Sequence, residues 1–171
     1  MINYETLAFL KDVANNNNRE WFAANKDRYE AARSSVLDFI EQLIPHLASA
    51  DPQFSIDTPA KKCLLRIYRD VRFSKNKDPY KTNFGITFNM KGSGVPNAEY
   101  YLHIQPDGKS FFAIGLWMPE SAILKKIREE IDYNTTEFLE IITAPDFKNL
   151  FELSKEDTLK TAPKGYESNH P

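Results

Sequence analysis

Glycine is distributed very unevenly along this chain of 171 residues, and its distribution constrains the fold more than any other feature. No glycine precedes Gly85, whereas five of the six glycines fall between residues 85 and 115. Glycine weakens helices but readily adopts the positive φ that tight turns need. The pattern therefore indicates a turn-rich centre of short strands, with helices on both sides of it.

Apolar residues on both sides of this centre recur at helical spacing. A first short helix is expected before the asparagine run of residues 15–18. A continuous apolar stripe over residues 19–47 then predicts one long amphipathic helix, capped by Asn18. After the centre, Pro119 is expected to open one helix and Asn134 another.

Four segments of the centre have the length and composition of strands: residues 62–70, 84–90, 100–105 and 111–118. The second and third alternate apolar and polar side chains, whereas the last is apolar on both faces, which is typical of a covered central strand. A P-D-G turn at residues 106–108 predicts a hairpin between the last two. The order of helices, strands and helices favours the α+β class. We expect an antiparallel meander of four or more strands, flanked by N-terminal and C-terminal helices.

The length of the chain suits one hydrophobic core, so we expect a single domain over residues 1–171. Its one cysteine, Cys63, has no partner within the chain, and the N-terminus lacks a basic start followed by a long apolar run. Both features predict a cytoplasmic location. No apolar stretch approaches the roughly 20 residues that cross a bilayer, so no membrane association is predicted.

Metal and cofactor sites have no support in the sequence. The three histidines, His46, His103 and His170, are far apart and lack the paired spacing of zinc sites. No glycine-rich phosphate loop and no nucleophile elbow occur. We therefore predict no metal and no cofactor, and the sequence leaves the oligomeric state open.

The charge is near balance overall but not locally. With 22 Lys and Arg against 24 Asp and Glu, the net charge of −2 argues against a partner such as nucleic acid. Residues 61–91, however, contain nine basic and two acidic residues, a net charge of +7, which leaves −9 for the rest. Such a field attracts anions to one region of the surface.

The arrangement of the basic residues suggests a binding site for an anion. Arg66, Arg72, Lys77 and Lys81 converge if the loop around Pro79 folds back on the preceding segment. Arginine binds phosphate bidentately and lysine acts as a point charge, so the mixture suits a phosphate-bearing small molecule. We expect the ligand contacts to come from seven residues: Arg66, Arg69, Arg72, Lys77, Tyr80, Lys81 and Asn83.

The same residues equally fit a purely structural role. Asp70 can pair with the neighbouring arginines and so fix the loop, with Phe73 and Tyr80 as apolar plugs. Two further hypotheses remain open. In a phosphoryl-transfer or phosphoester-cleaving enzyme, Asp70, His103 or His170 would be the catalytic acid or base. In a nucleic-acid-binding module, which we do not favour, the interleaved aromatic residues would stack on bases.

The segment over residues 66–83, R-I-Y-R-D-V-R-F-S-K-N-K-D-P-Y-K-T-N, resembles the signature R-x-x-R-D-x-R-F-x-x-x-K-x-P-Y-K-x-N. This signature belongs to a widely distributed bacterial family known only as conserved hypothetical proteins, a domain of unknown function. Residues 16–29, 115–119 and 163–171 also resemble the family. The resemblance implies that the segment 66–83, here called the basic motif, is a family property, and it implies no activity. Because family members usually continue beyond the closing H-P dipeptide, it also implies that a C-terminal segment is missing.

Overall fold

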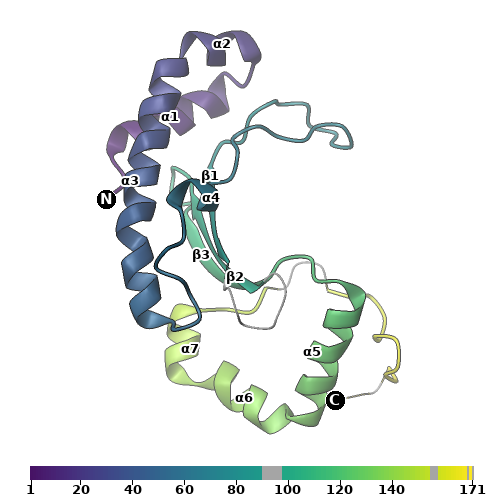
Figure 1. The fold of residues 1–171 in the computed structure, drawn as a ribbon. Helices are drawn as coiled ribbons and strands as arrows, with labels where there is room; N and C mark the ends of the chain where they lie inside the picture. Colours follow the sequence, from purple (N-terminus) through teal and green to yellow (C-terminus); the bar gives the residue numbers. More distant parts are fainter. Residues whose placement is uncertain (90–97, 155–157, 169, 171) are drawn as a thin grey trace. The chain divides into compact units, whose positions relative to one another are not determined.

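The computed structural model describes residues 1–89, 98–154, 158–168 and 170, which fall into two units, Met1–Pro119 and Glu120–Pro171 (Figure 1). The first unit combines helices with an antiparallel sheet, and the described part of the second contains helices. This confirms the predicted α+β class. The expectation of a single domain over residues 1–171 stays a prediction.

The first unit begins with helices whose bounds are α1 (Tyr4–Asn15), α2 (Arg19–Ala24) and α3 (Lys26–Ala50). The predicted cap is confirmed, because the Asn18 side chain accepts a hydrogen bond of 2.9 Å from the Trp21 amide. The single helix predicted over residues 19–47 is wrong. It is interrupted at Asn25, whose side-chain amide donates to the Trp21 carbonyl and so competes with continuous helical bonding.

The sheet of the first unit has three antiparallel strands in the order β1 (Phe84–Asn89), β2 (Ala98–Ile104) and β3 (Phe111–Leu116). The predicted hairpin between β2 and β3 is confirmed. Asp107 and Gly108 both have positive φ, which suits a tight turn between twisted strands. Met90, at the end of the second predicted strand, lies outside the described residues.

The expectation of four or more strands is wrong for the described residues. The segment 62–70 instead follows the short helix α4 (Ala60–Cys63) and makes only two isolated bridges, Leu64 to Ile86 and Tyr68 to Tyr80. Four residues separate the two bridges along the segment 64–68, but six separate them along the segment 80–86. The pairing between the two segments is therefore not a regular ladder.

The strand β3 also differs from its prediction as a covered central strand. It lies at the end of the sheet order, and the Phe111 and Ile114 side chains are half exposed. Its apolar composition indicated burial on both faces, but composition alone does not fix the position of a strand in a sheet.

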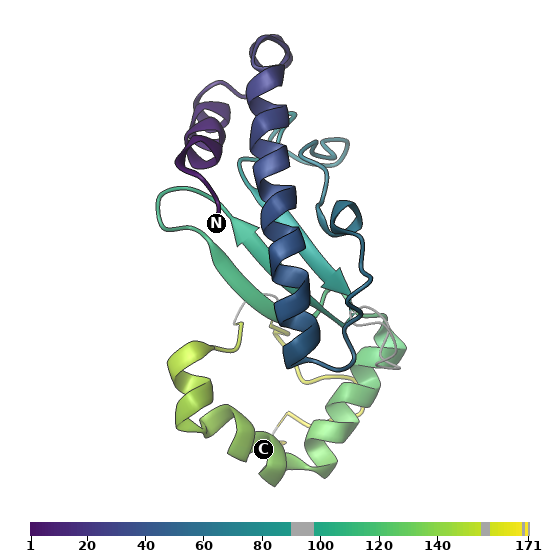
Figure 2. The ribbon, with the colours of Figure 1, turned by 60° about the vertical axis from the view of Figure 1, so that its left-hand side comes forward.

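The core of the first unit lies between the sheet and α3, which runs across one sheet face in Figure 2. The helix α3 and the strand β1 both contribute residues that are spaced for one face, and these are Ala32, Val36, Ile40, Ile44, Phe84, Ile86 and Phe88. The opposite face of the sheet therefore carries the residues that alternate with these along each strand.

The described part of the second unit contains α5 (Ser121–Tyr133), α6 (Thr135–Thr143) and α7 (Pro145–Leu150). The two helices predicted after Pro119 are present, and Pro145 occupies the first turn of α7. No helix among the described residues is long and apolar enough to span a membrane.

Candidate functional site

The basic motif forms the long loop between α4 and β1, and its two arms pair with each other (Figure 1). The Arg69 amide donates to the Pro79 carbonyl at 2.9 Å, and the Lys81 amide donates to the Ile67 carbonyl at 2.8 Å. These two bonds flank the bridge between Tyr68 and Tyr80. The loop therefore folds back on itself and brings residues near 66–69 beside residues 79–81.

The base of the loop is attached to the N-terminal helices by Asn17. The Asn17 side chain accepts a hydrogen bond of 3.1 Å from the Tyr80 amide and donates one of 2.9 Å to the Tyr80 carbonyl. The Tyr80 ring is only 6% exposed and stacks on Phe22 with centroids 3.9 Å apart. Tyr80 therefore packs in the core, as the structural hypothesis expected of its ring.

The tip of the loop is stiffened by contacts within the motif. Arg72 donates from Nε and Nη2 to the Asp70 carboxylate, at 3.0 and 2.6 Å. Lys77 Nζ donates to the Val71 carbonyl at 2.9 Å, and Arg69 donates to the Asp78 carbonyl at 3.1 Å.

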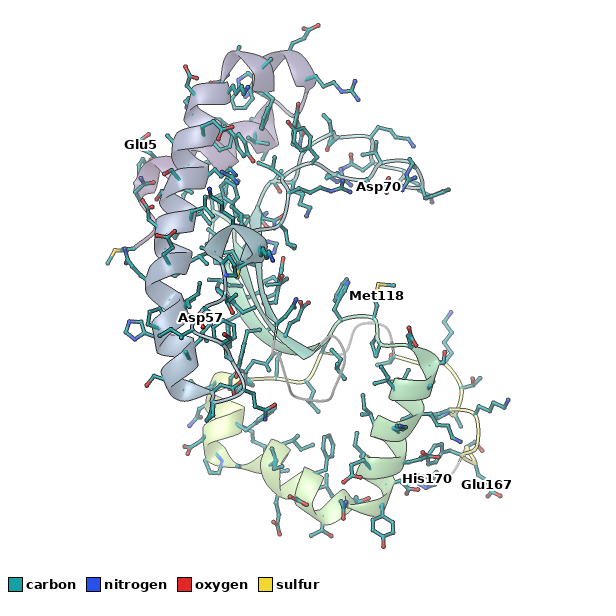
Figure 3. The ribbon with its side chains drawn as sticks, in the orientation of Figure 1. Glu5, Asp57, Asp70, Met118, Glu167 and His170 are labelled. Atoms are coloured by element: carbon teal, nitrogen blue, oxygen red, sulfur yellow. The ribbon has the colours of Figure 1, made fainter. Side chains whose placement is uncertain are left out.

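The Asp70 carboxylate is an orienting group. Hydrogen bonds from the Arg72 side chain and backbone, with a smaller contribution from the charge of Arg66, lower the pKa of Asp70 below its usual value. A carboxylate stabilised in its charged form accepts hydrogen bonds well but is a weak base. Asp70, labelled in Figure 3, thus holds Arg72 in place.

Arg66 and Lys81 differ from Arg69, Arg72 and Lys77, the cations of the motif whose side chains make contacts inside the loop. Neither forms an ion pair or side-chain hydrogen bond with another of the described residues, and Lys81 is half buried. Burial and then the nearby charge of Arg66 lower the pKa of Lys81. Two like charges are thus held close together, and among the described residues no carboxylate forms an ion pair with either of them. An anion between them would relieve their repulsion.

A chain of side-chain hydrogen bonds links the end of the motif to β2. Asn83 Nδ2 lies 3.4 Å from His103 Nδ1, and the Tyr101 hydroxyl lies 3.0 Å from the same nitrogen. On the other side of the ring, His103 Nε2 lies 2.7 Å from Gln105 Oε1. Because Gln105 Oε1 accepts, Nε2 carries the proton and Nδ1 accepts from the Tyr101 hydroxyl.

Gly85 provides the space for this arrangement. A Cβ atom at Gly85 would lie 3.0 Å from the Tyr101 hydroxyl oxygen and 3.2 Å from Leu65 Cδ1. Since Gly85 pairs with His103 across the two strands, the Tyr101 ring leans diagonally over the glycine to reach His103. Any larger residue would push the Tyr101 hydroxyl away from its position.

His170 belongs to the second unit, where its Nε2 lies 3.1 Å from an Asp132 carboxylate oxygen of α5 (Figure 3). Among the residues that the structure describes, no group of three or more His, Cys, Asp or Glu side chains is arranged to hold a metal ion.

The family model described as conserved hypothetical protein (DUF2461) matches residues 5–171. The chain belongs to this family. The match confirms the resemblance inferred from the sequence, and the DUF2461 description names no activity. No curated protein and no solved structure matches the chain.

Within this DUF2461 chain, the predicted ligand-binding residues divide into four sets. Arg66 and Lys81 have side chains without partners among the described residues, and Asn83 joins the hydrogen-bond chain of His103. The side chains of Arg69, Arg72 and Lys77 make contacts inside the loop, and Tyr80 packs in the core.

Sequence reasoning missed the role of Asn17. The asparagine run was interpreted only as a loop that ends a helix, and nothing in its composition indicated that one member would bond to Tyr80. The hydrogen-bond chain of His103 did have a signal in the sequence. Tyr101 and His103 of β2 and Gln105, which directly follows this strand, alternate with apolar residues, and this spacing predicts that all three share one face.

An open hollow of about 340 Å³ lies elsewhere in the first unit. Its lining comes from the N-terminus and α3 and includes Met1, Ser35 and Asp38. No residue of the basic motif lines it, so we assign it no part in the candidate site.

Proposed function

We propose that this chain binds a phosphate-bearing ligand through Arg66 and Lys81. The observation that carries the proposal is the proximity of these two cations, which have no carboxylate within ion-pair distance among the described residues. Arginine supplies a planar pair of donors and lysine a point charge, a combination that suits the several oxygens of a phosphate group.

The remaining motif residues support this site in different ways. Arg72 uses Nε and Nη2 on Asp70, so its Nη1 group is left as a further donor at the tip of the loop. The contacts of Arg69 and Lys77 hold the two arms of the loop together, and the hydrogen bond of Tyr80 to Asn17 anchors the residue that precedes Lys81. The structural and ligand-binding hypotheses then describe different residues of one motif.

Calorimetry with inorganic phosphate and pyrophosphate at low salt tests the proposal. We expect Arg66→Gln and Lys81→Gln each to weaken pyrophosphate binding at least tenfold, because each removes one charge-assisted contact. Lys75→Gln is the matched control: it makes the same charge change at an exposed position in the same loop and is expected to alter affinity less than twofold. Equal losses in Lys75→Gln and Lys81→Gln, or no binding by the unsubstituted chain, would refute the proposal.

A second candidate function is phosphoester cleavage, which the hydrogen-bond chain of His103 favours. Burial raises the pKa of Tyr101, with a smaller effect of Glu99, so its hydroxyl keeps its proton and donates it to His103. A ligand hydroxyl or a water molecule can pass a proton to Tyr101 oxygen while the Tyr101 proton moves to His103 Nδ1. The net result is transfer of one proton to His103.

Hydrolysis of bis(p-nitrophenyl) phosphate tests this second function. His103→Gln is expected to lower the rate about 100-fold, as the loss of a general base does. His46→Gln is the control, because His46 is an exposed histidine of α3. Absence of hydrolysis in the unsubstituted chain, or equal rates in both variants, would count against a catalytic role for His103.

A further inference from the structure

The most exposed aromatic residue of the basic motif is Phe73, at the tip of the loop. Its side chain is 96% exposed, although the structural hypothesis expected it to plug the core. A second aromatic residue of the same loop, Tyr68, is 52% exposed. Full exposure of a phenylalanine gains nothing for folding, because stabilisation by an apolar side chain comes from removing it from water.

Phe73 is held by the contacts that stiffen the loop. The Arg72 guanidinium carbon lies 5.8 Å from the centre of the Phe73 ring, and Asp70 fixes that guanidinium through two donors. Arg72 therefore approaches one face of the ring without covering it, and the ring stays exposed for stacking. Because the loop is already ordered by its own hydrogen bonds, stacking on Phe73 would cost little additional conformational entropy.

The loop that carries Phe73 is rich in cations. The motif contains six Lys and Arg residues against Asp70 and Asp78, a net charge of +4. Asp70 is occupied by Arg72, and the pair of Arg66 and Lys81 lies at the base of the loop, where the two arms meet. An exposed ring among cations that extend along a loop suits a ligand with several phosphates and with flat, stackable groups between them.

We propose that the basic motif binds single-stranded nucleic acid, with Phe73 stacked on a base and with Arg66, Arg72 and Lys81 contacting phosphates. This inference rests on the proposed function, since it uses the same anion-binding pair, and it adds the class of ligand. A membrane surface with anionic lipids is the alternative partner for exposed cations and an apolar ring. The single strand is favoured because the exposed Phe73 ring lies beside a guanidinium that Asp70 fixes, which puts a stacking surface next to a cation able to contact phosphate.

Fluorescence anisotropy with a labelled 15-nucleotide oligothymidylate measures this binding at several salt concentrations, and calorimetry with linear polyphosphate measures binding to a polyanion without bases. We expect Phe73→Ala to weaken oligonucleotide binding about 5- to 150-fold, the effect of losing one stacked base. Polyphosphate binding should stay unchanged. Tyr133→Ala is the matched control, because Tyr133 of α5 is an aromatic residue that is 89% exposed outside the motif.

The salt dependence separates stacking from phosphate contacts. Lys81→Gln should reduce the slope of log affinity against log salt by about 0.7, the change expected for one phosphate contact on a single strand. Phe73→Ala should leave that slope unchanged. Phe73→Leu should behave like Phe73→Ala, because leucine keeps the apolar exposure but has no ring to stack on a base.

The outcomes distinguish the nucleic-acid inference from the proposed anion site. If polyphosphate and the oligonucleotide bind equally tightly, and Phe73→Ala changes neither, the nucleic-acid inference is wrong while the proposed anion site stands. If neither polyanion binds at low salt, both are wrong. If Phe73→Leu retains full oligonucleotide binding, no stacking occurs and the inference is overturned. It is also overturned if vesicles containing one third phosphatidylserine bind through Phe73 while the oligonucleotide does not, because the loop is then a membrane contact.

Discussion

Replacing Asn17 by alanine tests whether the N-terminal helices hold the basic motif in place. The substitution removes both hydrogen bonds to Tyr80, one to its amide and one from the side-chain amide to its carbonyl. Each of these backbone groups is partly buried and loses its partner. An unsatisfied buried group costs roughly 1–3 kcal/mol, and partial access to water places each loss near the lower end.

The two losses together lower the free energy of unfolding by about 2 kcal/mol. For a chain of this size, about 2 kcal/mol corresponds to a fall of roughly 4–8 °C in the melting temperature. Urea titration followed by tryptophan fluorescence measures the change well, because Trp21 lies in α2 close to the attachment point. The loosened loop is also expected to lower the affinity for pyrophosphate, since Lys81 directly follows Tyr80.

Asn16→Ala is the matched control for this experiment. The Asn16 side chain is exposed and donates only to the Asp12 carbonyl of its own helix. Its loss is expected to cost less than about 0.5 kcal/mol, as for most surface substitutions. If Asn17→Ala lowers the free energy of unfolding no more than Asn16→Ala, the side chain of Asn17 does not attach the basic motif to the N-terminal helices.

Three further substitutions give distinct outcomes. Phe22→Ala removes the ring stacked on Tyr80, and because Phe22 is buried it is expected to cost about 3–5 kcal/mol in urea titration. Gly85→Ala introduces a Cβ atom against the Tyr101 hydroxyl and should destabilise the fold by about 1–3 kcal/mol. Because the Tyr101 hydroxyl is bonded to His103 Nδ1, the substitution should also change the nitrogen chemical shifts of the His103 ring, measured by NMR. The pKa of Lys81 is lower in the folded state than in the unfolded state. Between the lowered pKa and 10.5 the unfolded state therefore binds more protons. The contribution of Lys81 to the free energy of unfolding should rise as the pH increases through this range. The difference in unfolding free energy between the unsubstituted chain and Lys81→Gln, followed from neutral pH toward 10.5, checks this sign, and a constant difference contradicts it.

The parts of the fold that depend on local sequence were predictable. Asn18 was expected as a helix cap, and the P-D-G turn as a hairpin, because both features act within a few residues of themselves. The number of strands was not predictable in the same way. Segment 62–70 has the composition of a strand, yet its pairing depends on the offset between two distant segments, which its own residues do not encode.

The candidate site was predictable in composition but not in its internal division. The sequence showed that cations gather in one segment, because charge can be counted residue by residue. It did not show which cation would donate a hydrogen bond within the loop, as Lys77 does to the Val71 carbonyl. Nor did it show which cation would form no hydrogen bond or ion pair with another of the described residues, as is found for Arg66. Such partners are set by the path of the folded loop.

That division explains how one motif can serve both folding and binding. Donors of Arg69 are directed at the Asp78 carbonyl and the Ser74 hydroxyl, so removing its charge also removes bonds that close the loop. Lys81 instead carries a charge that burial and Arg66 disfavour, so the folded state gains nothing from its ionisation. An external anion beside Lys81, as proposed above, would offset this cost. Loss of Arg69 should therefore reduce stability first, whereas loss of Lys81 should reduce affinity without lowering stability.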